Sequence, residues 1–165
     1  AEGGYDWTLD LAGLFMVCDR FRYFIRVRYG ECDAQKVVFN SRYGDYVDLA
    51  TAEFLRVLGY EKELQSAELD YQLVKQTTEW RASAGYDDVL EISVATKHIG
   101  NTSFAISTEF RLAGEQPLIA ISETVYVHVD AKTLTKAPLP SHLREALARG
   151  APGLSVDHAA YLRSA

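Results

Sequence analysis

One amphipathic run, at residues 41–58, constrains the fold of this chain more than any other feature. Plotted at 100° per residue, the run has an apolar arc and an opposite polar arc. The apolar arc contains Tyr43, Val47, Ala50, Phe54, Val57 and Leu58, and the polar arc contains Arg42, Asp45, Asp48, Ala52 and Arg56. Asn40 or Ser41 can cap such a helix, and Gly59 can end it. The pattern predicts a helix of about 27 Å, which is long enough to cross a five-stranded sheet.

Strand-like runs lie on both sides of this helix in the sequence. One precedes it at residues 21–29, and four follow it at residues 71–82, 89–98, 103–112 and 118–129. Glycine-containing turns separate the later runs, residues 61–67 are expected to form a polar connector, and residues 141–149 a short helix. This order predicts an α+β fold in which an antiparallel five-stranded sheet wraps around one long central helix.

The chain has the size of one domain. Its 165 residues, with a hydrophobic content of 48%, suffice for one core. We place this domain at residues 20–149, with an N-terminal extension at residues 1–19 and a C-terminal tail at residues 150–165. The formal net charge of −6 argues against a nucleic-acid partner, because such a surface needs clustered Lys and Arg.

No segment is expected to enter a membrane. A spanning helix needs a run of about 18 or more apolar residues, and the sequence contains none. Glu2, Asp6 and Asp10 lie before and at the start of the apolar patch at residues 9–18, where a signal peptide needs positive charge. We therefore expect a cytoplasmic protein.

The cysteines and histidines show no metal-ligand spacing. Cys18 and Cys32 are 14 residues apart, so we expect reduced thiols rather than a metal or redox motif. The histidines, which also lack ligand spacing, are His98, His128, His142 and His158. The sequence also lacks a Gly-x-Ser-x-Gly elbow and a glycine-rich phosphate loop. No metal site is predicted.

One carboxylate, Asp33, lies in an acidic turn just upstream of the predicted helix start. Unpaired N–H groups and the helix macrodipole favour negative charge at such a position. The surrounding pattern consists of Tyr29-x-Glu31-x-Asp33, Val37-Val38, Asn40-x-x-Tyr43, Asp48, Phe54-Leu55-Arg56-x-Leu58-Gly59, Trp80, Asp87-Asp88, Gly100-Asn101-Thr102-Ser103-Phe104, Val127-His128-Val129-Asp130 and Pro138-Leu139-Pro140. Over residues 21–148 this pattern resembles the 4-hydroxybenzoyl-CoA thioesterase-like branch of the hotdog-fold acyl-CoA thioesterases.

The resemblance implies a hotdog fold and the hydrolysis of acyl-CoA or acyl-carrier-protein thioesters to a free acid and a thiol. It implies that Asp33 attacks the thioester carbonyl or activates water, and that the backbone N–H of Asn40 holds the carbonyl oxygen. A thiol with a pKa of about 8.5 leaves readily as a thiolate. One carboxylate and a helix N-terminus are therefore sufficient for thioester hydrolysis. Coenzyme A is then part of the substrate, and no separate cofactor is expected.

The resemblance also suggests substrate contacts and an assembly. Tyr29 and Tyr43 match family tyrosines that can line the acyl pocket. Lys97 is a candidate for binding coenzyme A phosphates, and Thr102 and Ser103 are candidates for hydrogen bonds to the pantetheine or acyl group. The resemblance implies a dimer of dimers, a homotetramer with active sites at the subunit interface, and the open edges of a small sheet independently favour at least a homodimer.

Each assignment has an ordinary structural alternative. Asp33 suits a turn and Asn40 suits a helix cap, whatever their chemistry. Tyr29 and Tyr43 suit aromatic core packing. Glu31 is expected to be a solvated or paired acid rather than a second catalytic group.

Two other functions remain open for the same fold. One is a dehydratase or hydratase of acyl thioesters, which needs an acid/base pair and typically a histidine, and no histidine lies near Asp33 in the sequence. The other is a non-catalytic subunit that binds acyl thioesters. The segment Lys36-Val37-Val38-Phe39-Asn40 also lacks the Gly-His pair and the histidine found in branches of the family. A mechanism that requires an imidazole there is therefore disfavoured.

Overall fold

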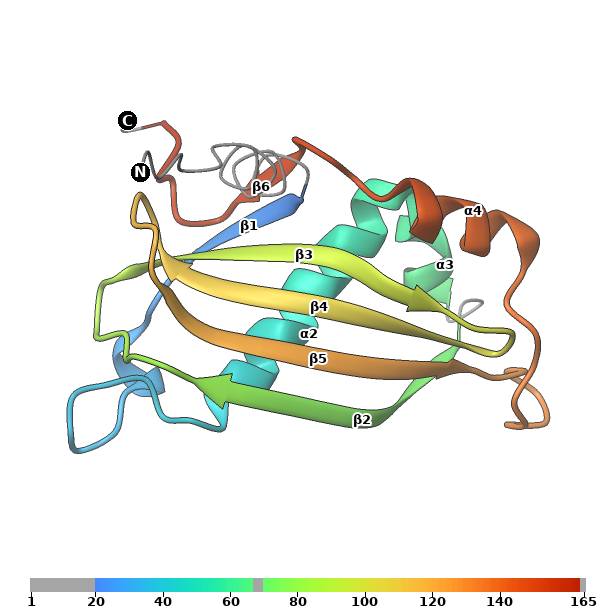
Figure 1. Cartoon of the computed structure of the whole chain (residues 1–165), viewed down its shortest axis with the longest axis horizontal. Helices are drawn as coiled ribbons and strands as arrows, with labels where there is room; N and C mark the ends of the chain where they lie inside the picture. Colours follow the sequence, from blue (N-terminus) through green and yellow to red (C-terminus); the bar gives the residue numbers. More distant parts are fainter. Residues whose placement is uncertain (1–19, 67–69, 164–165) are drawn as a thin grey trace, which may run out of the picture.

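The computed structural model describes residues 20–66 and 70–163, in which a curved sheet wraps around one long helix (Figure 1). The strands are β1 (Phe21–Arg26), β2 (Tyr71–Trp80), β3 (Val89–Ile99), β4 (Ser103–Leu112), β5 (Leu118–His128) and β6 (Ser155–Asp157). The helical elements are η1 (Tyr29–Glu31), α2 (Arg42–Leu55), η2 (Arg56–Tyr60), α3 (Glu61–Ser66) and α4 (Ser141–Arg149). The predicted α+β arrangement is confirmed.

The sheet has six strands in the order β2-β5-β4-β3-β1-β6. The first five pair antiparallel, as predicted, and β6 pairs parallel to β1 with Arg22 opposite Ser155. The prediction of five antiparallel strands is therefore wrong by one strand, which comes from the predicted tail. A strand of three residues is too short to show alternation in the sequence.

Helix α2 lies across one face of the sheet and supplies the centre of the core (Figure 1). Its 14 residues span about 21 Å, and the four members of the predicted apolar arc that lie within it, Tyr43, Val47, Ala50 and Phe54, are buried. The largest of its buried side chains are Tyr43, Tyr46, Phe54 and Leu55, which join Ile92, Ile106 and Phe110 from the sheet. Burial of this face holds the start of α2 at one end of the sheet.

Gly59, with φ of 99°, breaks the helical path within η2, as its predicted role at the helix end requires, and the polar connector that follows is itself helical, as α3. One local prediction near this helix is wrong. The first strand was expected to reach Tyr29, but β1 ends at Arg26 and residues 29–31 form a 3₁₀ turn.

None of the described helices, in residues 20–66 or 70–163, is long and apolar enough to span a membrane.

The segment after α4 returns along the outer side of β1 (Figure 1). The His158 N–H donates to the Phe24 carbonyl at 2.9 Å, and the Tyr161 ring stacks on Phe24 with centroids 5.5 Å apart. The carboxylate of Asp157 accepts the N–H groups of Ala159, Tyr161 and Leu162. Although desolvation raises the pKa of Asp157, these three donors hold it below its ordinary value. Asp157 therefore organises the turn that follows β6.

We expect Asp157→Ala to loosen this segment without unfolding the domain. Removing the carboxylate leaves three backbone donors without their acceptor, and amide exchange at residues 159–162 should accelerate by about tenfold or more. Amides of β3 and β4 serve as the internal control and should keep their rates. Hydrogen exchange followed by mass spectrometry measures both, and unchanged exchange at residues 159–162 would contradict this role.

Candidate functional site

A hairpin between β1 and α2 carries the candidate catalytic acid. Cys32 pairs with Val38 in an isolated antiparallel bridge, and the Asp33 N–H donates to the Val37 carbonyl at 2.9 Å. The Lys36 N–H closes the turn onto the Asp33 carbonyl at 2.9 Å, and Lys36 has φ of 65°. A tight turn whose fourth residue takes up the left-handed region is a common hairpin connection. Asp33 thus stands at the first position of a tight turn.

The Asp33 side chain takes part in this turn with one oxygen only. Its Oδ1 accepts the Gln35 N–H at 2.8 Å, as aspartates at this position commonly do. Its Oδ2 makes no hydrogen bond or ion pair with any other part of the chain that the structure describes. The turn interaction orients the carboxylate and leaves one oxygen for other chemistry.

A cavity of about 420 Å³ opens beside Asp33. Its lining consists of Tyr29, Gly30, Cys32, Asp33, Lys36 and Tyr86. The rings of Tyr29 and Tyr86 meet edge to face, with centroids 5.9 Å apart, although the residues are 82% and 61% exposed. The cavity therefore places an exposed aromatic pair next to a carboxylate.

Tyr86 was not among the predicted site residues. It reaches the cavity because the loop after β2 pairs with the hairpin: the Val38 N–H donates to the Ala84 carbonyl at 2.8 Å, and Val37 bridges to Gly85. The Asp88 carboxylate then accepts the Gly85 N–H at 2.7 Å. An aromatic residue beside Gly85 in a predicted turn was the only sequence signal.

The hairpin leads directly into the start of α2. The first turn is closed by the N–H groups of Arg42, Tyr43 and Gly44, which donate to the carbonyls of Phe39, Asn40 and Ser41. Within the described residues, the N–H of Asn40 itself makes no such bond, so it is one of the unpaired donors of the helix start. Asp33 lies at the tip of the hairpin and Asn40 lies at its base.

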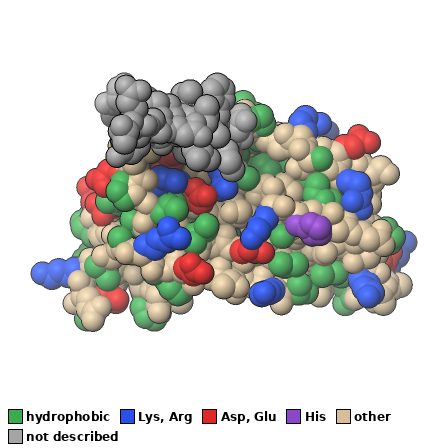
Figure 2. Space-filling model, in the orientation of Figure 1, with side chains coloured by type: hydrophobic (Ala, Val, Ile, Leu, Met, Phe, Trp, Pro, Cys, Tyr) green, Lys and Arg blue, Asp and Glu red, His purple; other side chains and the backbone are tan. Residues whose placement is uncertain are grey.

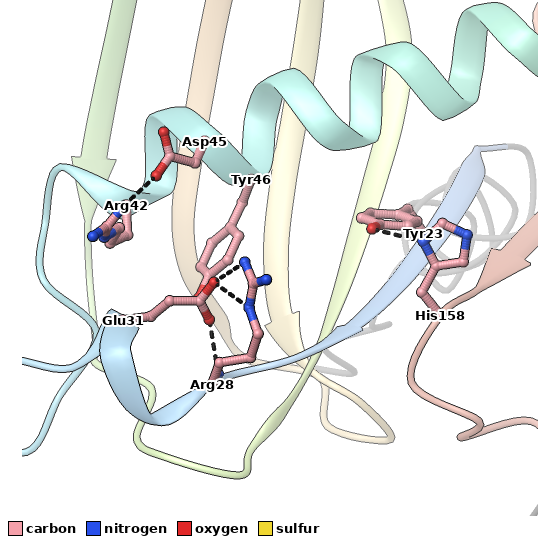
Figure 3. Close-up of polar contacts among 7 residues, drawn as sticks. All are labelled: Tyr23, Arg28, Glu31, Arg42, Asp45, Tyr46 and His158. Atoms are coloured by element: carbon pink, nitrogen blue, oxygen red, sulfur yellow. Dashed lines mark hydrogen bonds and ion pairs between the residues drawn. The ribbon is translucent and has the colours of Figure 1, made fainter.

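Glu31 is the buried acid of this region. Its carboxylate accepts the N–H of Arg28 at 2.7 Å, the Nε of Arg28 at 2.8 Å and the hydroxyl of Tyr46 on α2 at 2.8 Å (Figure 3). Of the two roles expected for Glu31, solvated or paired, the structure shows the paired one. Arg42 with Asp45 and Tyr23 with His158 form separate contacts nearby.

The other predicted substrate contacts lie elsewhere in the protomer. Tyr43 is 2% exposed and packs edge to face against Tyr46 and Phe110 in the core and against the half-exposed Trp80. Lys97 lies on the outer face of the sheet, paired with Glu123. Figure 2 shows that acidic and basic side chains are mixed on this face.

Thr102 and Ser103 lie at the turn between β3 and β4. The N-terminal end of β3 is held to the β1–η1 connection through the Val27 N–H and the Asp88 carbonyl, at 2.8 Å. The 11 residues of β3 therefore separate that turn from the hairpin by roughly 30 Å. Within one protomer, the structure brings Tyr29 to Asp33 but leaves Thr102 and Ser103 at the opposite end.

Cys32 lines the cavity but is not suited to act as a nucleophile. Desolvation raises the pKa of its thiol, and the charges of Asp33, Glu31 and Asp88 raise it further. The thiol therefore stays protonated near neutral pH. In the described residues, no three His, Cys, Asp or Glu side chains gather where they could hold a metal ion. Cys18 lies outside the described residues.

Comparisons with known proteins find thioesterases among this chain's relatives in sequence and in structure. The family model of the thioesterase-like superfamily matches residues 27–147. The acyl-CoA thioester hydrolase YbgC of Escherichia coli is 30% identical over 124 residues, which cover 74% of this chain and 92% of that protein. A hypothetical protein from Aquifex aeolicus (28% identity, TM-score 0.71) and a gentisyl-coenzyme A thioesterase (28% identity, TM-score 0.67) are similar in structure. Each similarity covers 77% of this chain and 98% of that chain.

The left-handed backbone at Lys36 gives a test of the hairpin geometry. An L-residue there is strained, so Lys36→Gly should raise the free energy of unfolding by about 0.5–1 kcal/mol relative to Lys36→Ala. The alanine variant is the matched control because it removes the same side chain but keeps the strain. Urea denaturation measures the difference, and equal stability of the two variants would contradict the turn described here.

Proposed function

Because the chain belongs to the thioesterase-like superfamily, we propose that it hydrolyses acyl-CoA thioesters to a free acid and coenzyme A. The observation that supports this most directly is the carboxylate of Asp33 beside an aromatic-lined cavity, with one oxygen that has no partner among the described residues. The hairpin that carries it ends at a helix start where, in the same part of the chain, the Asn40 N–H is also unpaired. These are the two groups that thioester hydrolysis requires, an oxygen nucleophile or base and a donor for the oxyanion.

In this proposal, Asp33 acts on the thioester carbonyl carbon. Its free oxygen either attacks that carbon or removes a proton from a water molecule that attacks it. Negative charge then develops on the carbonyl oxygen, where the N–H of Asn40 and the dipole of α2 stabilise it. Collapse of this intermediate breaks the carbon–sulfur bond and releases the thiolate of coenzyme A, which takes up a proton from water. Direct attack by Asp33 leaves a mixed anhydride, which water hydrolyses in a second step.

The acyl group lies against Tyr29 and Tyr86 in this arrangement. Two exposed aromatic rings in contact offer an apolar wall whose burial by an acyl group is favourable. The thiol of Cys32 faces the same cavity as a neutral group. Acyl-carrier-protein thioesters present the same carbonyl and are the alternative carrier in the substrate panel below.

We also propose that a second copy of the chain completes the site. Strand β2 has a neighbour on one side only among the described strands, and its edge exposes Leu73, Val74 and Trp80. The opposite edge of the sheet is occupied by β6. An exposed ten-residue edge favours pairing with another copy. A partner placed antiparallel along β2 would bring its own Thr102 and Ser103 towards the end of the sheet that carries Asp33.

Asp33→Asn should lower kcat for the best acyl-CoA substrate by about a hundredfold or more, because the variant keeps the turn acceptor but loses the charge. Release of free thiol from a panel of acyl-CoA and acyl-carrier-protein esters measures the rate. Asp87→Asn is the control, since Asp87 is an exposed acid in the adjoining loop and Asn tolerates its φ of 69°. Equal rates for the wild type and Asp33→Asn would exclude Asp33 from the mechanism.

Val74→Lys should weaken the dimer, because it places a charge on the apolar part of the β2 edge. Sedimentation velocity at micromolar concentration should show a dimer or larger species for the wild type and a shift towards monomer for the variant. Lys75→Glu, which changes charge on the same strand without altering apolar area, is the control. A monomeric wild type would refute the shared site.

A further inference from the structure

The carboxylate of Glu31 is the one acid of the hairpin region that is buried, at 7% exposure. Both of its oxygens are occupied: the guanidinium of Arg28 donates to Oε1, and the Arg28 N–H and the Tyr46 hydroxyl donate to Oε2 (Figure 3). The backbone bond, from a residue three positions earlier, resembles the glutamate half of a capping box. A buried carboxylate is tolerated only when its oxygens are satisfied in this way.

The protonation states of this cluster are well defined. Desolvation raises the pKa of Glu31, but the Arg28 side chain, the Arg28 N–H and the Tyr46 hydroxyl more than offset this and lower it. Burial raises the pKa of Tyr46, and its bond to Glu31 raises it further. Glu31 is therefore an anion and Tyr46 a neutral donor across the whole neutral range. The bond between them does not depend on small changes of pH.

The cluster joins the two halves of the proposed site. Glu31 precedes Asp33 by two residues, and its carbonyl accepts the Phe39 N–H at 2.9 Å, so it belongs to both arms of the hairpin. Tyr46 lies in α2, one turn after Arg42, the first residue of that helix. The Tyr46–Glu31 bond is therefore a direct polar link between the hairpin that carries Asp33 and the helix whose start offers the Asn40 N–H.

We propose that Glu31 and Tyr46 are positioning residues, which set the placement of Asp33 relative to the oxyanion donor at Asn40. This inference rests on the proposed function. Neither residue lines the cavity, so neither is expected to contact the acyl group. Because catalysis is sensitive to misplacement of the order of 1 Å, loss of the link should slow the chemical step more than it weakens substrate binding.

A purely structural role predicts a different result. In that case Tyr46→Phe would lower the melting temperature, while the folded fraction of the enzyme kept its kcat. A control for lost stability is available in Tyr126→Phe, because Tyr126 of β5 is a buried tyrosine (3% exposed) that packs against Tyr71 of β2 and Phe104 of β4. It lies outside the hairpin and does not contact the cavity beside Asp33.

The experiment measures kcat and KM for Tyr46→Phe, Glu31→Gln and Tyr126→Phe with the acyl-CoA ester that the wild type hydrolyses best, well below each melting temperature. We expect Tyr46→Phe and Glu31→Gln to lower kcat by about tenfold to a hundredfold with KM changed by less than about threefold, and Tyr126→Phe to keep both. Amide exchange at residues 37–40 should accelerate in the first two variants only.

The outcomes separate this inference from the proposed function. An active wild type whose kcat survives Tyr46→Phe, with exchange at residues 37–40 unchanged, overturns the positioning role and leaves the proposed function intact. A wild type that releases no thiol from any ester in the panel overturns both.

Discussion

Burial of one face of α2 against the curved sheet is the constraint on which the rest of this structure depends. The buried side chains of the helix include Tyr43, Tyr46 and Phe54, and each fully buried side chain of this size contributes about 1.5–3 kcal/mol or more. A helix fixed in this way has a fixed N-terminus. The hairpin before it must therefore fold over the end of the sheet where α2 begins, and the loop before β3 meets it there.

Apolar packing alone does not orient that hairpin, because the hydrophobic effect has no direction. The orientation comes from hydrogen bonds at its two ends. At the tip, the Asp33 carboxylate accepts the Gln35 N–H, and at the base Glu31 binds Arg28 and Tyr46. The polar contacts decide where a carboxylate points, and the core decides where the hairpin lies. A chemical site on a loop needs both.

Much of this arrangement could be predicted from the sequence, since long periodic segments carry their own signal. The bounds of β4 and α4 agree with the prediction to the residue, and the apolar face of α2 follows from a period of 3.6. Gly59 leaves the helical path at the predicted helix end, and α3 follows without a buried side chain. The rest depends on contacts between distant residues. The short strand β6 forms only because β1 offers it an edge.

The candidate site also combines residues that the sequence predicts with residues that only distant contacts bring in. Asp33 and Asn40 were predicted as site residues because a motif of fixed spacing carries them, and Tyr29, from the same motif, lines the cavity beside Asp33. Tyr86 reaches that cavity from a loop about 50 residues away, through a pairing that no local pattern encodes. Glu31 was expected to be a solvated or paired acid, and the 3₁₀ turn at residues 29–31 rotates it into the core, where it is paired. Its partner on α2 was predicted as a helical residue and not as a hydrogen-bond donor.

The geometry of a single protomer also limits what it can do alone. The ends of β3 are roughly 30 Å apart, so the hydroxyls of Thr102 and Ser103 cannot reach a carbonyl held by Asp33 of the same chain. Pairing along β2 places the far end of one sheet beside the near end of the other, because strands in such a pair run antiparallel. In the proposed shared site these hydroxyls therefore come from a partner subunit, which makes the exposed edge of β2 part of that proposal.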